Sequence, residues 1–206
     1  MSDTDLTALI AGRRSIRRYR ADPVTSEVVQ RLVRAASAAP SAHNRQPWRF
    51  IALTEATAKK RLARAMGARL AADRTRDGDD PEAIRRDVER SFARITGAPV
   101  VILVALTIGE MDAYPDAKRR EAEYLMAVQS TAMATQNLLL AAHAEGLGAC
   151  WLCAPLFCPD TVRGALDLAT DLQPQGLVTL GYPAQPGKER PRKALDDILL
   201  VAEVAR

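Results

Sequence analysis

The stretch from Ala98 to Leu106 constrains the fold more than any other part of the chain. It is apolar at every position and rich in β-branched residues. A strand with one face in water would alternate apolar and polar residues, so an unbroken apolar run predicts a strand buried on both faces. Such a strand requires helices on both sides of its sheet. The sequence therefore predicts a layered fold with a sheet between helices.

Apolar periodicity places the other elements around this strand. Further strands are predicted over residues 48–53, 149–155 and 175–183, and helices over residues 3–12, 26–38, 55–74, 82–95, 119–144 and 159–168. Strands and helices alternate irregularly, which favours an α+β three-layer α/β/α sandwich over a doubly wound fold. No internal repeat or composition break divides the chain. We expect one domain over residues 1–206, with a charged helical excursion at about 55–96 that is either a lid over a site or two peripheral helices.

The helix at 119–144 carries the main indication of assembly. Its middle, residues 125–134, is apolar or small on nearly every side. A helix of this kind lies inside a structure or inside an oligomer. In a chain of this size it predicts a dimer whose core the helix helps to form. The C-terminal residues 195–204 are expected to pack as an extended arm or an edge strand.

The segment from Pro40 to Arg49 is dense in hydrogen-bonding side chains. Its two prolines disfavour helical backbone in the residues before them, so the run between them is expected in extended or turn form. Amides offer both donors and acceptors, which suits recognition of a planar heterocycle. The segment is therefore either a ligand-binding loop delivered onto a strand or an ordinary surface loop.

Two basic segments lie at opposite ends of the chain, at residues 13–20 and 188–193. The first holds five Arg residues within eight positions. Guanidinium groups so close together repel each other unless an anion lies among them, and their planar forks suit phosphate. This segment is interpreted as a phosphate or oxyanion clamp, with a solvated basic strand as the alternative.

Composition excludes several other classes of function. The net charge of +4 comes from dispersed Lys and Arg residues, without a one-sided basic helix or interleaved aromatics, so no nucleic-acid partner is expected. Cys150, Cys153 and Cys158 lack a second ligand pair, so no metal is expected and the thiols are predicted to be reduced. The acidic start of the sequence leads us to expect no secretory segment, and the sequence holds no run of about 20 apolar residues. A cytoplasmic protein without a membrane partner is expected.

Four motifs in order carry a resemblance to a known family. They are RRSIRRY at 13–19, APSAHNRQPW at 39–48, GLGACW at 146–151, and LGYP at 180–183 followed by RPR at 190–192. With these motifs the chain, over about residues 5 to 200, resembles the FMN-dependent nitroreductase family. The stretches YPDA at 114–117, EAE at 121–123 and GACW at 148–151, with the charged excursion, most resemble the C-terminal flavin domain of the bifunctional ligases that build coenzyme F420.

The resemblance implies a mostly antiparallel sheet and a domain-entwined homodimer with flavin sites at its interface. It implies that Arg13, Arg14, Ser15 and Arg17 hold the phosphate, ribityl chain and pyrimidine edge of FMN, with Arg190 and Arg192 completing the phosphate clamp. We call residues 40–46 the amide loop. Its flavin contacts would come from Pro40, Ser41, Ala42, Asn44 and Gln46, some of them from the partner subunit. Trp151, Leu152, Cys153 and Ala154 would lie along the isoalloxazine.

The chemistry implied by the resemblance needs no catalytic side chain, because the flavin carries the hydride. The donor would be NAD(P)H or a deazaflavin, and the acceptor a conjugated small molecule such as a nitroaromatic, quinone or enamide. Arg14 or Arg17 would stabilise anionic reduced flavin, and His43 would touch substrate. His143 is interpreted as a packed or helix-end residue, and Cys153 and Cys158 as small buried residues or as a reactive thiol beside the flavin.

Two alternative functions remain open within this resemblance. One is the reduction of a dehydro precursor of coenzyme F420, with the basic groove of the 59–95 helices binding that acidic coenzyme. The other is a flavin-binding or sensing module without turnover.

Overall fold

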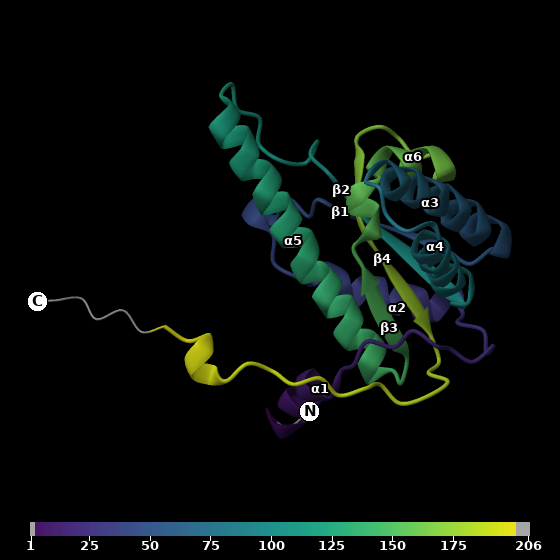
Figure 1. The fold of residues 1–206 in the computed structure, drawn as a ribbon. Coiled ribbons are helices and arrows are strands. Elements are labelled where there is room, and N and C mark those ends of the chain that lie inside the picture. The colour runs from purple at the N-terminus through teal and green to yellow at the C-terminus, as the bar shows by residue number, and fades with distance from the viewer. Residues whose placement is uncertain (1–2, 201–206) are drawn as a thin grey trace, which may run out of the picture.

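Strand β2 (Val100–Thr107) runs through the middle of a four-stranded sheet in the computed structural model, which describes residues 3–200 (Figure 1). The sheet has the order β1-β2-β4-β3, and every neighbouring pair is antiparallel. The other strands are β1 (Trp48–Leu53), β3 (Gly148–Leu152) and β4 (Leu172–Gly181). Every residue of β2 is buried, as the unbroken apolar run predicts.

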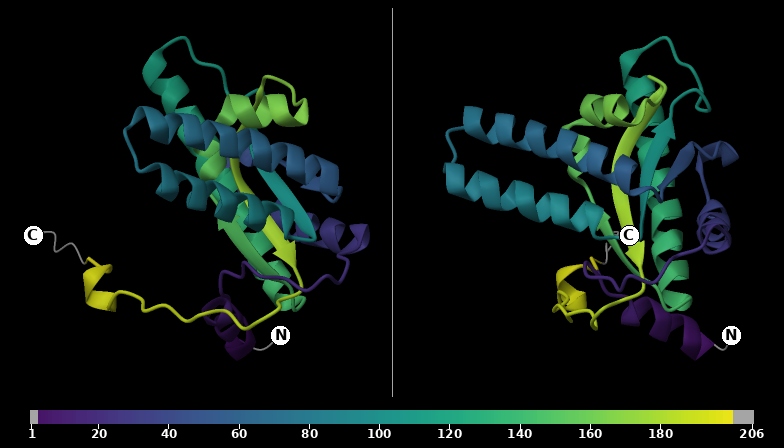
Figure 2. Two further views of the ribbon diagram at one scale, coloured as in Figure 1. Left: turned by 45° about the vertical axis from the view of Figure 1, so that its right-hand side comes forward. Right: turned by 90° about the vertical axis from the view of Figure 1, so that its right-hand side faces the viewer.

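The two faces of β2 enter two separate cores. Val100, Ile102 and Val104 pack with α2 (Ser26–Ser37) and α5 (Ala117–Ala144), whereas Val101 and Leu103 pack with α3 (Ala56–Arg76), α4 (Pro81–Thr96) and α6 (Pro159–Leu166). Successive side chains of a strand point to opposite faces, so one apolar run supplies both cores. The views of Figure 2 show the sheet between these two helical layers. The predicted α/β/α sandwich with an antiparallel sheet is confirmed.

Short local signals set where the main helices begin and end. The side chains of Thr25, Asp80 and Asp116 accept hydrogen bonds from the backbone N–H three residues later, at the starts of α2, α4 and α5. Helix α5 ends at Ala144, and Gly146 follows with a φ of 75° that suits glycine. The Leu147 N–H then donates to the Ala142 carbonyl at 2.8 Å. These caps fix the direction in which the chain enters and leaves each helix.

Helices α3 and α4 form the charged excursion. Their apolar side chains Leu62, Met66 and Ile95 pack onto the sheet face opposite α5, and the far ends of both helices project beyond the sheet (Figure 2). The linking loop is shorter than the predicted charged loop at 73–81, because α3 continues to Arg76. Arg74 forms ion pairs with Asp79 and Asp87, which tie the loop to α4.

Helix α5 has one buried face and one exposed face within a single chain. Residues such as Ala127, Ala134 and Leu138 are fully buried against the sheet, whereas Leu125 is 54% and Met133 is 42% exposed. The sheet therefore covers only one side of this helix within a single chain, and of the two alternatives for its apolar middle, burial inside an oligomer stays a prediction. None of the described helices is long and apolar enough to cross a membrane.

Helix α1 (Asp3–Gly12) and the chain directly after β4 both lie near the C-terminal end of α5 (Figure 1). Helix α1 contacts α5, and the chain after β4 passes α1 and then leaves the body as an arm. The arm holds one short turn, η3 (Leu195–Asp197), and its residues up to 200 form no strand. Of the two predictions for residues 195–204, the described part fits the extended arm, and residues 201–204 lie outside the described residues.

Candidate functional site

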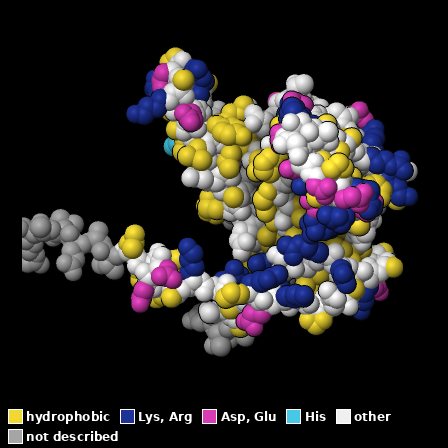
Figure 3. Space-filling model, in the orientation of Figure 1, with side chains coloured by type: hydrophobic (Ala, Val, Ile, Leu, Met, Phe, Trp, Pro, Cys, Tyr) yellow, Lys and Arg dark blue, Asp and Glu magenta, His cyan; other side chains and the backbone are white. Residues whose placement is uncertain are grey.

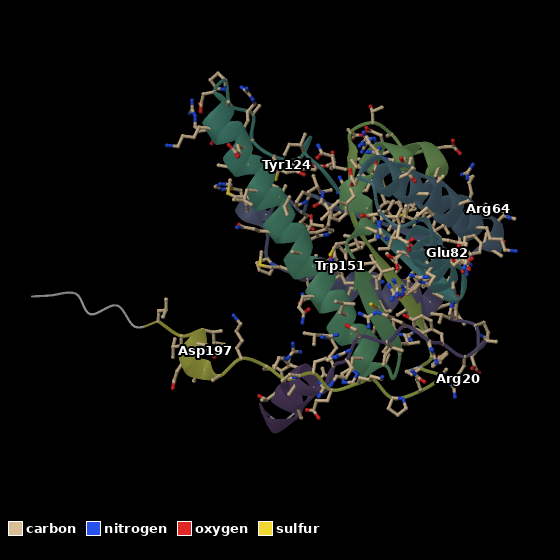
Figure 4. The ribbon with its side chains drawn as sticks, viewed as in Figure 1. Arg20, Arg64, Glu82, Tyr124, Trp151 and Asp197 are labelled. Carbon is tan, nitrogen blue, oxygen red and sulfur yellow. The ribbon has the colours of Figure 1, made fainter. Side chains whose placement is uncertain are left out.

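The basic segment after α1 crosses the ends of two strands. Ser15 bridges to Ala149 on β3, and the Ile16 N–H donates to the Ala149 carbonyl at 3.0 Å. Farther along, Tyr19 bridges to Pro183, and the Arg20 N–H donates to the Tyr182 carbonyl at 2.9 Å. Ile16 is buried in this crossing, so the neighbouring arginines are held at the surface. Arg20 marks the far end of the crossing in Figure 4.

Tyr19 anchors this segment to the sheet. Its hydroxyl oxygen lies 2.6 Å from the Ile16 carbonyl, 2.7 Å from the Thr179 hydroxyl and 3.0 Å from the Thr179 carbonyl. Burial raises the pKa of the Tyr19 hydroxyl well above its usual range, so the group remains a neutral donor. Thr179 is a buried residue of β4. The position of the arginine segment is thus fixed from inside the fold.

The chain after β4 lies across the same segment. The Ala184 N–H donates to the Arg18 carbonyl at 3.0 Å, and a Cβ at Gly187 would overlap the side chain of Arg14. Only glycine permits so close an approach. Glu189 forms an ion pair with Arg14 at 3.4 Å. We call residues 185–192 the strap, because this part of the arm closes over residues 13–18.

A cleft of about 720 Å³ lies between the strap and residues 10–18. Its lining contains a single carboxylate, Glu189, and seven cationic side chains: Arg13, Arg14, Arg17, Arg18, Lys188, Arg190 and Arg192. The structure thus brings together the two basic segments from opposite ends of the sequence, with Ser15 between them. Lys and Arg side chains gather along this lower part of the molecule in Figure 3. We call this site the basic cleft.

Most cations of the basic cleft have no carboxylate partner. Within the described residues, only Arg14 of the seven lies within 4.0 Å of a carboxylate oxygen. Arginines elsewhere are commonly paired, as in Arg69–Asp73 and Arg85–Glu89. Uncompensated guanidinium groups in a concave site favour an anionic ligand. The donors fit a phosphate-bearing cofactor such as FMN, and the described residues hold no cluster of metal-ligating side chains.

The amide loop at residues 40–46 has an unusual backbone. His43, Asn44 and Gln46 have φ values of 49°, 54° and 50°, in the left-handed region that side chains disfavour. The loop is stabilised by the Ser41 Oγ atom, which accepts from the Gln46 N–H at 3.0 Å, and by Ser130 Oγ on α5, which accepts from the Ala42 N–H at 3.3 Å. Strained residues of this kind concentrate at functional sites.

One chain does not bring the amide loop to the basic cleft. The loop contacts α5 at Ser130, whereas Arg13 and Arg14 lie near His143 on the same helix. At 1.5 Å per residue, these two positions are about 20 Å apart along the helix axis. Pro40, Ser41, Ala42, His43, Asn44 and Gln46 therefore form one group, and the residues of the basic cleft form another.

The expected flavin-facing strand occupies a third position. Trp151 lies on the side of the sheet that faces α5 (Figure 4), with its indole against Gly176 of β4. Leu152 is half-buried, and Cys153 and Ala154 are exposed at the start of the turn η2 (Ala154–Phe157). Of the two expectations for Cys153, the buried residue is wrong, because β3 ends at Leu152 and Cys153 lies exposed after it. The thiol beside the flavin stays a prediction. Cys158 is buried as expected.

Three structural supports escaped sequence reasoning. Tyr19 and Ser130 hold the arginine segment and the amide loop, and Gly187 lets the strap approach Arg14. Only Gly187 could have been found from the sequence, because a glycine beside a basic segment indicates a close approach of the backbone. Burial also raises the pKa of the Cys150 thiol, which disfavours a reactive thiolate there.

Comparisons with known proteins show what the chain is similar to. Residues 10–182 match the sequence model of the nitroreductase family. A curated NADH dehydrogenase of Thermus thermophilus is 29% identical over 91% of each chain. A Methanothermobacter thermautotrophicus protein, provisionally named NADH dehydrogenase/NAD(P)H nitroreductase, is 30% identical over 91% of this chain and 82% of its own. A crystal structure of a Desulfovibrio desulfuricans protein in complex with FMN aligns with a TM-score of 0.73 and 30% identity, over 97% of this chain and 98% of the other.

Proposed function

The chain belongs to the nitroreductase family, and from this membership we propose that it is an FMN-dependent oxidoreductase. Its electron donor would be NAD(P)H or a deazaflavin, and its acceptor a conjugated small molecule such as a nitroaromatic, quinone or enamide. The observation that carries the proposal is the basic cleft, where six cations lack a carboxylate partner within the described residues. Such a site suits the terminal phosphate of FMN.

Each group of site residues has a role in this proposal. The segment with Arg13, Arg14, Ser15 and Arg17 holds the phosphate, the ribityl chain and the pyrimidine edge of FMN. Arg190 and Arg192 complete the phosphate clamp. The amide loop recognises the edge of the flavin ring, since Asn44 and Gln46 offer donors and acceptors on a constrained backbone. Trp151, Leu152, Cys153 and Ala154 line the ring, and His43 contacts the acceptor.

The complete site would form only in a homodimer. The amide loop and the basic cleft lie apart in one chain, so the loop of one subunit would serve the cleft of the other. Exposed apolar side chains support this assembly: Leu125 and Met133 on α5, Leu156 and Phe157 on η2, and Leu195, Ile198, Leu199 and Leu200 on the arm. Apolar side chains gathered along α5 and across the hollow beside it are visible in Figure 3. A second copy of the chain would remove this surface from water.

Bound FMN would supply the redox chemistry by carrying a hydride from donor to acceptor. The protein's own residues bind and orient it. Guanidinium groups near the ring, for which Arg14 and Arg17 are the candidates, favour negative charge on the reduced cofactor. The wall of Trp151 and its neighbours limits the access of water to one side of the ring.

Reduction of a dehydro precursor of coenzyme F420 is the second candidate. Most arginines of α3 and α4 do not favour the groove expected for that acidic coenzyme, because they are paired with carboxylates, among them Arg69, Arg74, Arg85 and Arg90. The basic cleft has the free positive charge that this ligand would need.

The absorbance spectrum of the purified protein, followed by anaerobic addition of NADH or NADPH, tests the proposal. We expect a flavin band that bleaches on reduction. A band that persists with both nucleotides but bleaches with a reduced deazaflavin would assign the other donor. Bound flavin that no donor reduces would instead indicate a sensing module. If the protein binds no FMN after reconstitution, the proposed function is wrong.

A further inference from the structure

The basic cleft carries more positive charge than one phosphate requires. Its lining holds seven cationic side chains and a single carboxylate. A phosphate monoester brings a charge of about −1.5 to −2 at neutral pH. Even with such a group bound, several cations would remain without a counter-charge. Clusters of like charge destabilise a fold unless a ligand compensates them.

The volume of the cleft also indicates room for more than one phosphate group. Its volume of about 720 Å³ falls within the range of about 300–1,000 Å³ that is typical of pockets for whole small molecules. A phosphate group with the end of a ribityl chain fills only a part of this space. The remaining volume lies against the same cationic side chains.

Arg18 and Lys188 are the two cations that the FMN assignment leaves unused. They come from opposite walls, Arg18 from the crossing segment and Lys188 from the strap. The hydrogen bond from the Ala184 N–H to the Arg18 carbonyl joins these walls, and Gly187 next to Lys188 lies against Arg14. Both side chains are exposed, and neither has a carboxylate partner within the described residues.

We propose that Arg18 and Lys188 form a second phosphate subsite, which binds the 2′-phosphate of a phosphorylated nicotinamide nucleotide. This inference rests on the proposed function, which supplies the nicotinamide donor. A compact ammonium and a guanidinium fork on facing walls suit a phosphate monoester. The protein would therefore prefer NADPH to NADH, because NADPH carries a phosphate monoester at the 2′ position and NADH carries none.

Binding of two adenine nucleotides to the FMN-loaded protein tests the subsite without turnover. Adenosine 2′,5′-bisphosphate and adenosine 5′-monophosphate differ only in the 2′-phosphate. We expect the bisphosphate to bind about tenfold more tightly or better by calorimetry, the scale of one or two charge-assisted hydrogen bonds. The ratio of kcat/KM for NADPH over NADH should favour NADPH to a similar extent.

Arg18→Ala plus Lys188→Ala should abolish both preferences while FMN stays bound. Lys60→Ala plus Arg64→Ala is the matched control, because it removes two exposed α3 cations that have no part in the cleft. It should keep the preference for the bisphosphate. Raised salt should weaken that preference, as expected for exposed charges.

Two failures can be told apart. If the protein binds FMN and is reduced by NADH, but both adenine nucleotides bind equally, the subsite is refuted and the proposed function stands. If the Arg18 and Lys188 variant loses FMN, these residues belong to the cofactor clamp and the subsite is likewise refuted. If the wild-type protein takes up no FMN at all, the proposed function itself fails.

Discussion

The indole of Trp151 on β3 occupies the space that a side chain at Gly176 on β4 would need. Gly176 lies beside the irregular register between β2 and β4, where Val104 pairs with Gly176 and Ala105 with Pro174. The missing Cβ lets the ring pack directly against the backbone of β4. The wall expected along the flavin thus depends on a glycine of the neighbouring strand.

Gly176→Ala should displace this indole. Overpacking of a well-filled core typically costs about 1–3 kcal/mol of unfolding free energy. Urea denaturation monitored by tryptophan fluorescence would report both the loss of stability and the shift of the ring. Gly164→Ala on α6 is the matched control, since its Cβ would meet no atom within 4 Å and alanine favours helix. Equal stability changes in the two variants would contradict the packing argument.

Arg14→Ala plus Arg192→Ala should release FMN. Both side chains line the basic cleft, one from each wall. With FMN in excess, the wild-type Tm should rise and that of the variant should not, because a ligand that binds only the folded state stabilises it by mass action. Flavin content and thermal denaturation measure this. Lys60→Ala plus Arg64→Ala removes the same charge elsewhere and should retain the cofactor. Stoichiometric flavin in the cleft variant would show that the clamp is assigned wrongly.

Tyr19→Phe should lower stability and change its pH dependence. The variant leaves the Thr179 hydroxyl and the Ile16 carbonyl without this partner, at a cost of about 1–3 kcal/mol. Burial raises the pKa of Tyr19 above its ordinary value of about 10. The folded state thus binds the proton more tightly, so the stabilisation is complete below about pH 10 and is lost as the pH rises toward the folded-state pKa.

Urea denaturation of the wild type and of Tyr19→Phe from pH 8 to pH 11 would measure this dependence. The wild type should lose unfolding free energy more steeply above about pH 10. Tyr124→Phe, at an exposed tyrosine of α5, should follow the wild type. Parallel curves for all three proteins would show that Tyr19 does not contribute in this way.

Local patterns were sufficient to predict the layers of the fold. The apolar run of β2 required two helical layers, and Gly146 marked the end of α5. The backbone of the amide loop was harder, because Pro47 excludes helical geometry at Gln46 but does not distinguish extended from left-handed backbone. In the structure Gln46 has left-handed backbone, and its N–H donates to Ser41 Oγ.

The supports of the site depend on contacts that are distant in sequence. Tyr19 follows a run of arginines and resembles an exposed residue until Thr179, 160 positions later, is placed beside it. Cys153 is exposed because β3 ends at Leu152, and sequence patterns do not locate the end of a strand to within one residue. The two basic segments, at residues 13–20 and 188–193, could be predicted to share a ligand only because both are dense in positively charged side chains.

Subunit mixing tests whether one site is built from two chains. One variant carries Arg14→Ala and Arg192→Ala in the basic cleft, and the other carries Asn44→Ala and Gln46→Ala in the amide loop. Neither homodimer should bind FMN well, because every site lacks one part. In a heterodimer, one site collects both defects and the other receives an intact cleft and an intact loop. Random pairing makes about half of the dimers mixed, so about a quarter of the sites should bind FMN. Co-refolding the two variants and measuring flavin per chain gives the answer. If both groups of residues serve the site of their own chain, no mixture contains a complete site, and flavin binding should stay as low as in the separate variants.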